Sequence, residues 1–166
     1  MKLILVMAFS VLVPQSDKKA QPQERPMTAH AQMNERGEKG MGFSQTATTH
    51  HFLLTSDGGV IQVETKAAAD ATSRGEIRMH LTHIAKAFQS GDFDIPMFVH
   101  DTVPPAVPEM KRLQKEIRYS FAETPNGGRV VISSANKEAL DAIRRFLRFQ
   151  IQEHRTGDPV DVPKER

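Results

Sequence analysis

Residues 48–64 read TTHHFLLTSDGGVIQVE and contain the pattern that decides the fold. Residues 48–54 are rich in β-branched and apolar side chains, and residues 60–64 alternate apolar with polar side chains. Both patterns are typical of β-strands. The intervening residues 56–59, SDGG, have the composition of a tight turn. The stretch therefore predicts a β-hairpin.

An amphipathic helix is predicted after this hairpin, over about residues 74–90. Its start is indicated by Ser73 and Glu76, which have the spacing of a capping box, and its end by Gly91. The apolar face consists of side chains that recur at helical spacing: Ile77, Leu81, Ile84 and Phe88.

The second half of the chain repeats this order of elements. Residues 117–122 and 129–132 predict two strands around a Pro-Asn-Gly-Gly turn, and a helix over about 137–155 follows, beginning after Ser134 or Asn136. A shift of 66 positions superimposes the two predicted helices and pairs Ile77 with Ile143, Arg78 with Arg144 and Leu81 with Leu147. The match suggests an internal duplication of one β-β-α unit.

A single hairpin and helix cannot bury their apolar faces alone. We therefore predict an α+β domain in which two β-β-α units form a four-stranded, mainly antiparallel sheet with both helices on one face. The connection over residues 91–108 carries four prolines and is interpreted as a strap across the core or as a functional loop. A short helix is predicted next, over about residues 109–115.

The amino-terminal residues have the composition of a secretory signal. Lys2 precedes eleven residues, 3–13, of which only Ser10 is polar. This run is shorter than the roughly 20 apolar residues of a membrane-spanning helix. We expect an exported protein, periplasmic or extracellular, with no transmembrane span after processing. The alternatives are a wrongly assigned start of a cytosolic protein and an uncleaved anchor. The expected organisation is a signal peptide and leader (1–31), a flexible segment (32–46), a single α+β domain (47–158) and a tail (159–166).

Composition and charge argue against several classes of function. The 166 residues include no cysteine, so disulfides, thiolate metal sites and cysteine nucleophiles are excluded. Residues 1–31 carry 4 of the 22 Lys and Arg and 2 of the 20 Asp and Glu, so 18 of each remain in the rest of the chain. This balanced charge, with no basic run, argues against nucleic-acid binding.

Histidines are concentrated in the middle of the chain, and five of the seven lie between His50 and His100. On a helical wheel, Glu76, His80 and His83 fall within about 60° on one flank of the apolar face. Two histidines three residues apart on a helix can share one metal ion. At most one of His50 and His51 can join them, because neighbours on a strand point to opposite faces. The candidate ligands of a zinc or copper ion are His80, His83, Glu76, His50, His51, His100 and Asp101.

Packing is the alternative role for these histidines. In the internal repeat, His80 and His83 correspond to Phe146 and Phe149, and His154 is expected to be a core or helix-end residue. The neighbouring His100 and Asp101 could form a base and its orienting partner. No catalytic residue is assigned, since the chain has neither a Gly-x-Ser-x-Gly elbow nor a His-Glu-x-x-His motif.

The sequence therefore predicts an exported, non-enzymatic binding protein with a histidine-rich transition-metal site. Methionine thioethers are minor candidate ligands for copper, namely those of Met33, Met41, Met79, Met97 and Met110. The alternative is an envelope-associated module that binds another envelope protein through the open sheet face or an edge strand, with histidines that only pack.

Overall fold

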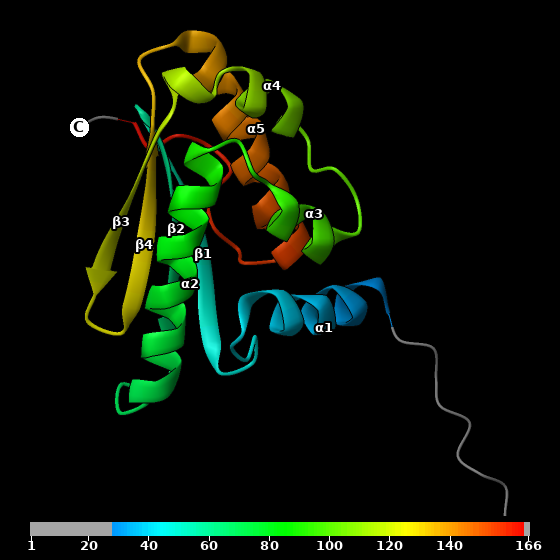
Figure 1. Ribbon diagram of the computed structural model, residues 1–166, viewed down its shortest axis with the longest axis vertical. Coiled ribbons are helices and arrows are strands. Elements are labelled where there is room, and N and C mark those ends of the chain that lie inside the picture. Colours follow the sequence, from blue (N-terminus) through cyan, green and yellow to red (C-terminus); the bar gives the residue numbers. More distant parts are fainter. Residues whose placement is uncertain (1–27, 165–166) are drawn as a thin grey trace, which may run out of the picture.

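The computed structural model describes residues 28–164 and confirms the predicted fold class (Figure 1). Four antiparallel strands form one sheet in the order β1-β2-β4-β3. The two long helices, α2 and α5, pack against it. The strands are β1 (Thr48–Thr55), β2 (Gly58–Thr65), β3 (Arg118–Thr124) and β4 (Gly127–Ser133). The helices are α1 (Ala29–Met41), α2 (Ala71–Gln89), α3 (Asp94–His100), α4 (Val107–Arg112) and α5 (Lys137–His154), with a short 3₁₀ turn, η1, at Gln114–Glu116.

Each long helix packs mainly on the hairpin of the other β-β-α unit. Helix α2 lies against β4 and β3, whereas α5 lies against β1 and β2. Two arginines at equivalent positions of the repeat, Arg78 and Arg144, also contact the hairpin of the other unit. Arg78 on α2 donates hydrogen bonds to the carbonyls of Gly127 (3.0 Å) and Thr124 (2.9 Å) in the second hairpin. Arg144 on α5 donates to the carbonyl of Ser56 (2.8 Å) in the first, so the two units are interlocked.

The core fills the space between the sheet and these helices. Leu81 and Leu147, the central residues of the two predicted apolar faces, are 2% and 0% exposed. Gly59 on β2 lies so close to the side chain of Leu147 that a Cβ atom there would collide with it. Gly59 lies in β2 after the turn, so the glycine at this position is required by helix packing rather than by the turn.

The ends of the long helices follow from side-chain caps, and one predicted cap is wrong. Helix α2 begins at Ala71 because the Asp70 side chain accepts a hydrogen bond from the Ser73 amide (2.9 Å). Ser73 is thus inside the helix and is not the cap of a Ser73–Glu76 capping box. The other predicted start is confirmed, since the Asn136 side chain caps α5.

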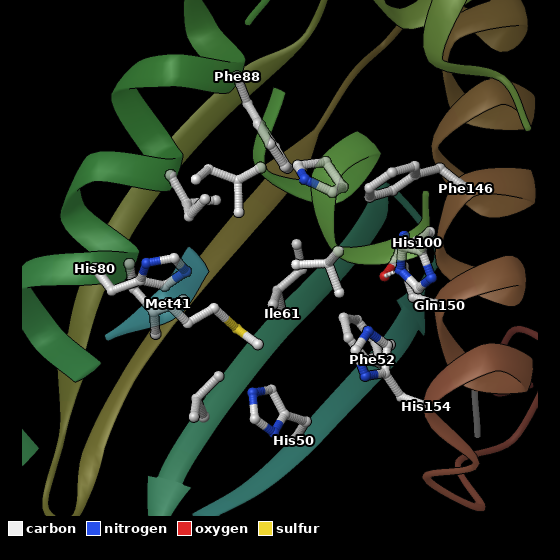
Figure 2. A pocket seen from close by; sticks show the side chains of 16 residues that line it. Met41, His50, Phe52, Ile61, His80, Phe88, His100, Phe146, Gln150 and His154 are labelled. Carbon is white, nitrogen blue, oxygen red and sulfur yellow. Dashed lines mark hydrogen bonds between the residues drawn. The ribbon is translucent and has the colours of Figure 1, made fainter. Parts of the chain in front are cut away.

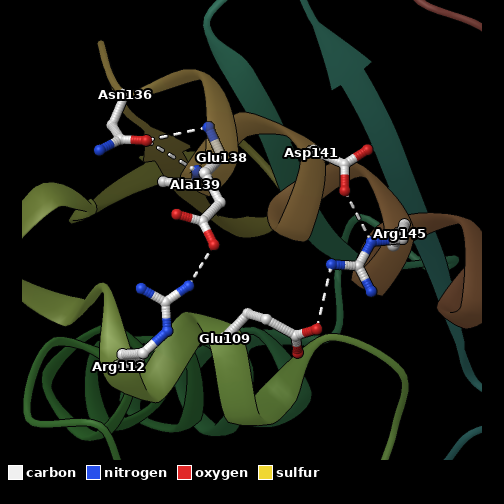
Figure 3. Close-up of polar contacts among 7 residues, drawn as sticks. All are labelled: Glu109, Arg112, Asn136, Glu138, Ala139, Asp141 and Arg145. Carbon is white, nitrogen blue, oxygen red and sulfur yellow. Dashed lines mark hydrogen bonds and ion pairs between the residues drawn. The ribbon is translucent and has the colours of Figure 1, made fainter.

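Ion pairs hold α4 against the first turns of α5 (Figure 3). Arg112 pairs with Glu138, and Arg145 contacts both Glu109 (3.3 Å) and Asp141 (2.8 Å). These pairs lie at the surface, where each contributes little to stability. Together they fix the end of the proline-rich connection beside α5. Within that connection, α3 takes the place of the predicted strap or loop.

The structure corrects the expectation of a flexible segment over residues 32–46. Helix α1 occupies most of this range and packs against α3. The Arg36 Nε donates a hydrogen bond to the carbonyl of Val99 (2.9 Å), and Met33 is buried. Two glycines within α1 lower its intrinsic helix propensity, so tertiary contacts rather than local sequence stabilise it. The predicted apolar signal segment lies outside the described residues. Within residues 28–164, no helix is long and apolar enough to cross a membrane.

Candidate functional site

A small cavity lies between the sheet, α2, α3 and α5, and histidines from four elements line it (Figure 2). Its volume is about 60 Å³, which is room for a few water molecules or one small ligand. The remaining lining is mostly aliphatic and aromatic, with no Asp, Glu, Lys or Arg. The lining histidines are His50 on β1, His80 on α2, His100 on α3 and His154 on α5.

The local backbone structure explains why these histidines all line the same cavity. Strand alternation points His50 and Phe52 toward the helices and turns His51 the other way. His100 and His154 are the last residues of their helices, and the residue after each adopts a left-handed conformation that ends the helix. Both rings thereby come to the same end of the core.

The rings of three of these residues are in contact. The ring centres of His50 and His154 are 5.9 Å apart with nearly parallel planes, and those of His100 and His154 are 5.1 Å apart with perpendicular planes. The phenyl rings of Phe43 and Phe52 extend the stack at 6.0 Å from His50 and 5.3 Å from His154. Histidine here supplies part of an aromatic core.

Buried nitrogen atoms without hydrogen-bond partners are concentrated at this place. We define the histidine cluster as His30, His50, His100 and His154, with His30 contributed by α1. Seven buried side-chain polar atoms in the described residues have no partner, and four of them belong to this cluster or to the adjoining Gln150. They are His30 Nε2, His50 Nε2, His100 Nδ1 and Gln150 Nε2. Such atoms are uncommon in folded proteins and point to a missing water, ion or ligand.

Burial keeps the cavity histidines neutral. Burial first, and nearby histidines second, lower the pKa of His50 and of His80 to about 4 and that of His154 to about 3. Burial also lowers the pKa of His100, although a hydrogen bond to Gln150 (2.9 Å) and the charge of Glu153 oppose the shift. At pH 7 these rings are uncharged, the form in which imidazole binds metals.

The candidate ligands from the sequence are only partly brought together. His50, His80 and His100 line the cavity, whereas His83 and Asp101 are exposed and Glu76 lies outside the lining. The predicted trio of Glu76, His80 and His83 is therefore split, because His80 turns inward. Within residues 28–164, no three His, Asp or Glu side chains are placed so that they could hold a metal ion as they stand.

The predicted pairing of His100 with Asp101 is wrong. His100 is hydrogen-bonded to Gln150, and Asp101 is the exposed, left-handed residue that ends α3. A different pair forms instead: His51 Nδ1 lies 2.9 Å from Oδ1 of Asp158. The other carboxylate oxygen of Asp158 accepts a hydrogen bond from the Phe52 amide (2.9 Å).

Two members of the histidine cluster are not among the candidate ligands. The expected core or helix-end position of His154 is confirmed, since it is the last residue of α5 and its ring stacks on that of His50, whereas His30 belongs to the predicted leader. Their positions depend on where α1 and the end of α5 pack, which no local pattern reveals. Comparisons of this chain with protein-family models, with curated proteins and with solved structures give no match.

Proposed function

We propose that this chain is an exported, non-enzymatic binding protein that holds one transition-metal ion, zinc or copper, on the histidine cluster. The observation that carries the proposal is the pair of unpaired buried nitrogens on His50 and His100; the Nε2 of His100 donates to Gln150, which leaves the lone pair of its Nδ1 free. An unpaired buried polar atom costs free energy. A metal ion would accept the lone pairs of these nitrogens and remove that cost.

The distances between the imidazole ring centres support the binding of one ion by several of these histidines. Metal–nitrogen distances of 2.0–2.1 Å place two imidazole ring centres about 5–6 Å apart when both rings bind one ion. The spacings of 5.1 Å between His100 and His154 and 5.9 Å between His50 and His154 fall in this range. To bind one ion these side chains would have to rotate, because within residues 28–164 no three of them are placed to hold a metal ion as they stand.

The surroundings favour an ion bound by neutral ligands. No charged side chain lines the cavity, and the low pKa values of His50 and His154 leave their lone pairs free at neutral pH. Imidazole is a suitable ligand for both zinc and copper. The thioether of Met41, which lines the same cavity, would add a soft ligand for cuprous copper (Figure 2).

A second candidate function has its own support. The stacking of His50 between Phe43 and His154 shows these rings packing as aromatic residues do. On this alternative the histidines are structural, no metal binds, and the chain is an envelope-associated module whose partner is another envelope protein.

Metal analysis separates the two candidates. Protein purified without an affinity tag is assayed for bound metal and titrated with zinc and, without oxygen, with cuprous ion. We expect one ion per chain and a rise in the melting temperature, because a ligand that prefers the folded state stabilises it. His154→Phe should abolish binding, and the exposed His83→Phe is the matched control. A metal-free protein whose melting temperature does not respond to either ion would support the structural alternative.

A further inference from the structure

A second, more open pocket lies beside the cavity, between α1, β1 and the end of α5. Its volume is about 330 Å³, and His30, His50 and His154 belong to its wall. The histidine cluster thus separates the cavity from this polar pocket. A pocket of this size has room for a small organic molecule.

The charge of the polar pocket has one sign. Its lining includes Lys66 and Arg155 but no Asp or Glu. In the part of the chain that the structure describes, neither cation has a carboxylate within ion-pair distance. The Lys66 ammonium group donates a hydrogen bond to the carbonyl of Thr46 (2.7 Å), which holds it at the edge of the pocket. Its charge is therefore not neutralised.

The neighbouring carboxylate of Asp158 lies outside the lining and is not within ion-pair distance of Lys66 or Arg155. Its two oxygens accept hydrogen bonds from His51 and from the Phe52 amide, and its side chain is only 8% exposed. His51 itself lines the pocket and turns Nδ1 toward Asp158.

Neutral donors complete the lining. Thr46 and Thr156, whose hydroxyl groups can donate hydrogen bonds, belong to the wall. The unpaired Nε2 of His30 belongs to this wall as well; the Nδ1 of that ring accepts from the Asn34 amide nitrogen (3.4 Å), so Nε2 carries the proton and can donate. Two cations among neutral donors, with no competing carboxylate, form an arrangement that recognises oxyanions.

We propose that the polar pocket binds a small oxyanion, with Lys66 and Arg155 as the charged contacts. The shared chemistry is a phosphate or carboxylate group. The volume beyond that group leaves room for an organic part of the ligand. The proposal rests on the pocket's own residues and does not require a metal on the histidine cluster.

The test uses the full chain, freed of metal by a chelator, and follows backbone amide signals by NMR. Inorganic phosphate and acetate are titrated separately, against sodium chloride of equal ionic strength. We expect saturable shifts confined to residues such as Thr46, Thr49, Lys66 and Thr156. A stronger response to phosphate would assign a phosphorylated ligand, and a stronger response to acetate would assign a carboxylic acid.

Substitutions then locate the contacts. Lys66→Gln and Arg155→Asn should each weaken binding about tenfold or more, because each removes a charge-assisted hydrogen bond. Asparagine is chosen because position 155 has a φ of 52°, which asparagine tolerates. Lys86→Gln, an exposed lysine outside the pocket, is the matched control. The absence of saturable shifts with both anions, or affinities unchanged by both pocket substitutions, would overturn the proposal.

Discussion

The imidazole of His51 and the carboxylate of Asp158 form a pair across 107 residues of sequence, with Nδ1 2.9 Å from Oδ1. Because Asp158 also accepts a hydrogen bond from the Phe52 amide, it closes part of the open edge of β1. Two further contacts hold the residues after Asp158 in place. Arg148 donates a hydrogen bond to the carbonyl of Val160 (2.8 Å), and Val162 packs against the core. The pair thus anchors the carboxyl-terminal segment beside the polar pocket.

The first prediction concerns this anchor. Asp158→Ala should lower the free energy of unfolding by about 1–3 kcal/mol, because it leaves a buried amide and an imidazole without their acceptor. His51→Ala should cost less, since the His51 side chain is 42% exposed. Urea unfolding of both single variants and the double variant measures the coupling between them. Strictly additive effects would show that the pair contributes nothing as a pair.

The second prediction is a loss of stability in mild acid. The pKa values of His50 and His80 are about 4 in the folded chain, below the ordinary value near 6.5, so the unfolded chain takes up protons first. Stability is therefore fully present above about pH 6.5 and is lost as the pH falls toward about 4, by about 3 kcal/mol for each residue. Urea unfolding at several pH values measures the slope. In His80→Phe, the slope of the free energy of unfolding against pH should correspond to about one proton fewer taken up on unfolding. An unchanged slope would contradict the low pKa of His80.

The third prediction tests the core. Leu81→Ala and Leu147→Ala should each destabilise the protein by about 2–5 kcal/mol, because each leaves a cavity between a helix and the sheet. Leu53→Ala, at a side chain that is 36% exposed, is the control and should cost less than about 1 kcal/mol. Equal denaturation midpoints for the three variants and the parent would show that the two leucines are not central to the core.

The fourth prediction separates the helix flank from the histidine cluster. His83→Phe and His80→Phe both copy the second helix of the repeat, where phenylalanine occupies the corresponding positions. Both variants should fold with stability within about 1.5 kcal/mol of the parent. Both should also retain zinc or copper affinity, because neither residue belongs to the cluster. Loss of zinc or copper affinity in both variants would show that the metal binds on the flank of α2, at His80 and His83, and not on the histidine cluster.

The fifth prediction concerns processing of the amino terminus. We expect the mature chain to begin between about residues 17 and 28, since processing there would remove the apolar segment and keep α1 complete. Amino-terminal sequencing of the protein from separated cell fractions tests this. A cytosolic protein that retains Met1 would rule out export.

The local elements of the fold were predictable because each depends on short-range chemistry. The Ser-Asp-Gly-Gly and Pro-Asn-Gly-Gly stretches predict two turns, each followed directly by a strand, and apolar residues at helical spacing predict α2 and α5. The repeat also identified Arg78 and Arg144 as equivalent positions. The sequence did not reveal that each arginine contacts the hairpin of the other unit. Each helix could also pack on the hairpin of its own unit, and local sequence patterns do not distinguish these two arrangements.

The sequence by itself determined the two β-β-α units, their amphipathic faces and the absence of thiolate chemistry. Only the tertiary structure decided that α1 forms, and which histidines meet. His100 and its partner Gln150 are 50 residues apart, and His30 and His154 come from helices whose ends no local pattern brings together. Helix and turn signals are set by steric and burial preferences over a few residues. The meeting of the histidines depends on how the helices pack over the sheet, because long-range contacts form only when the whole core closes.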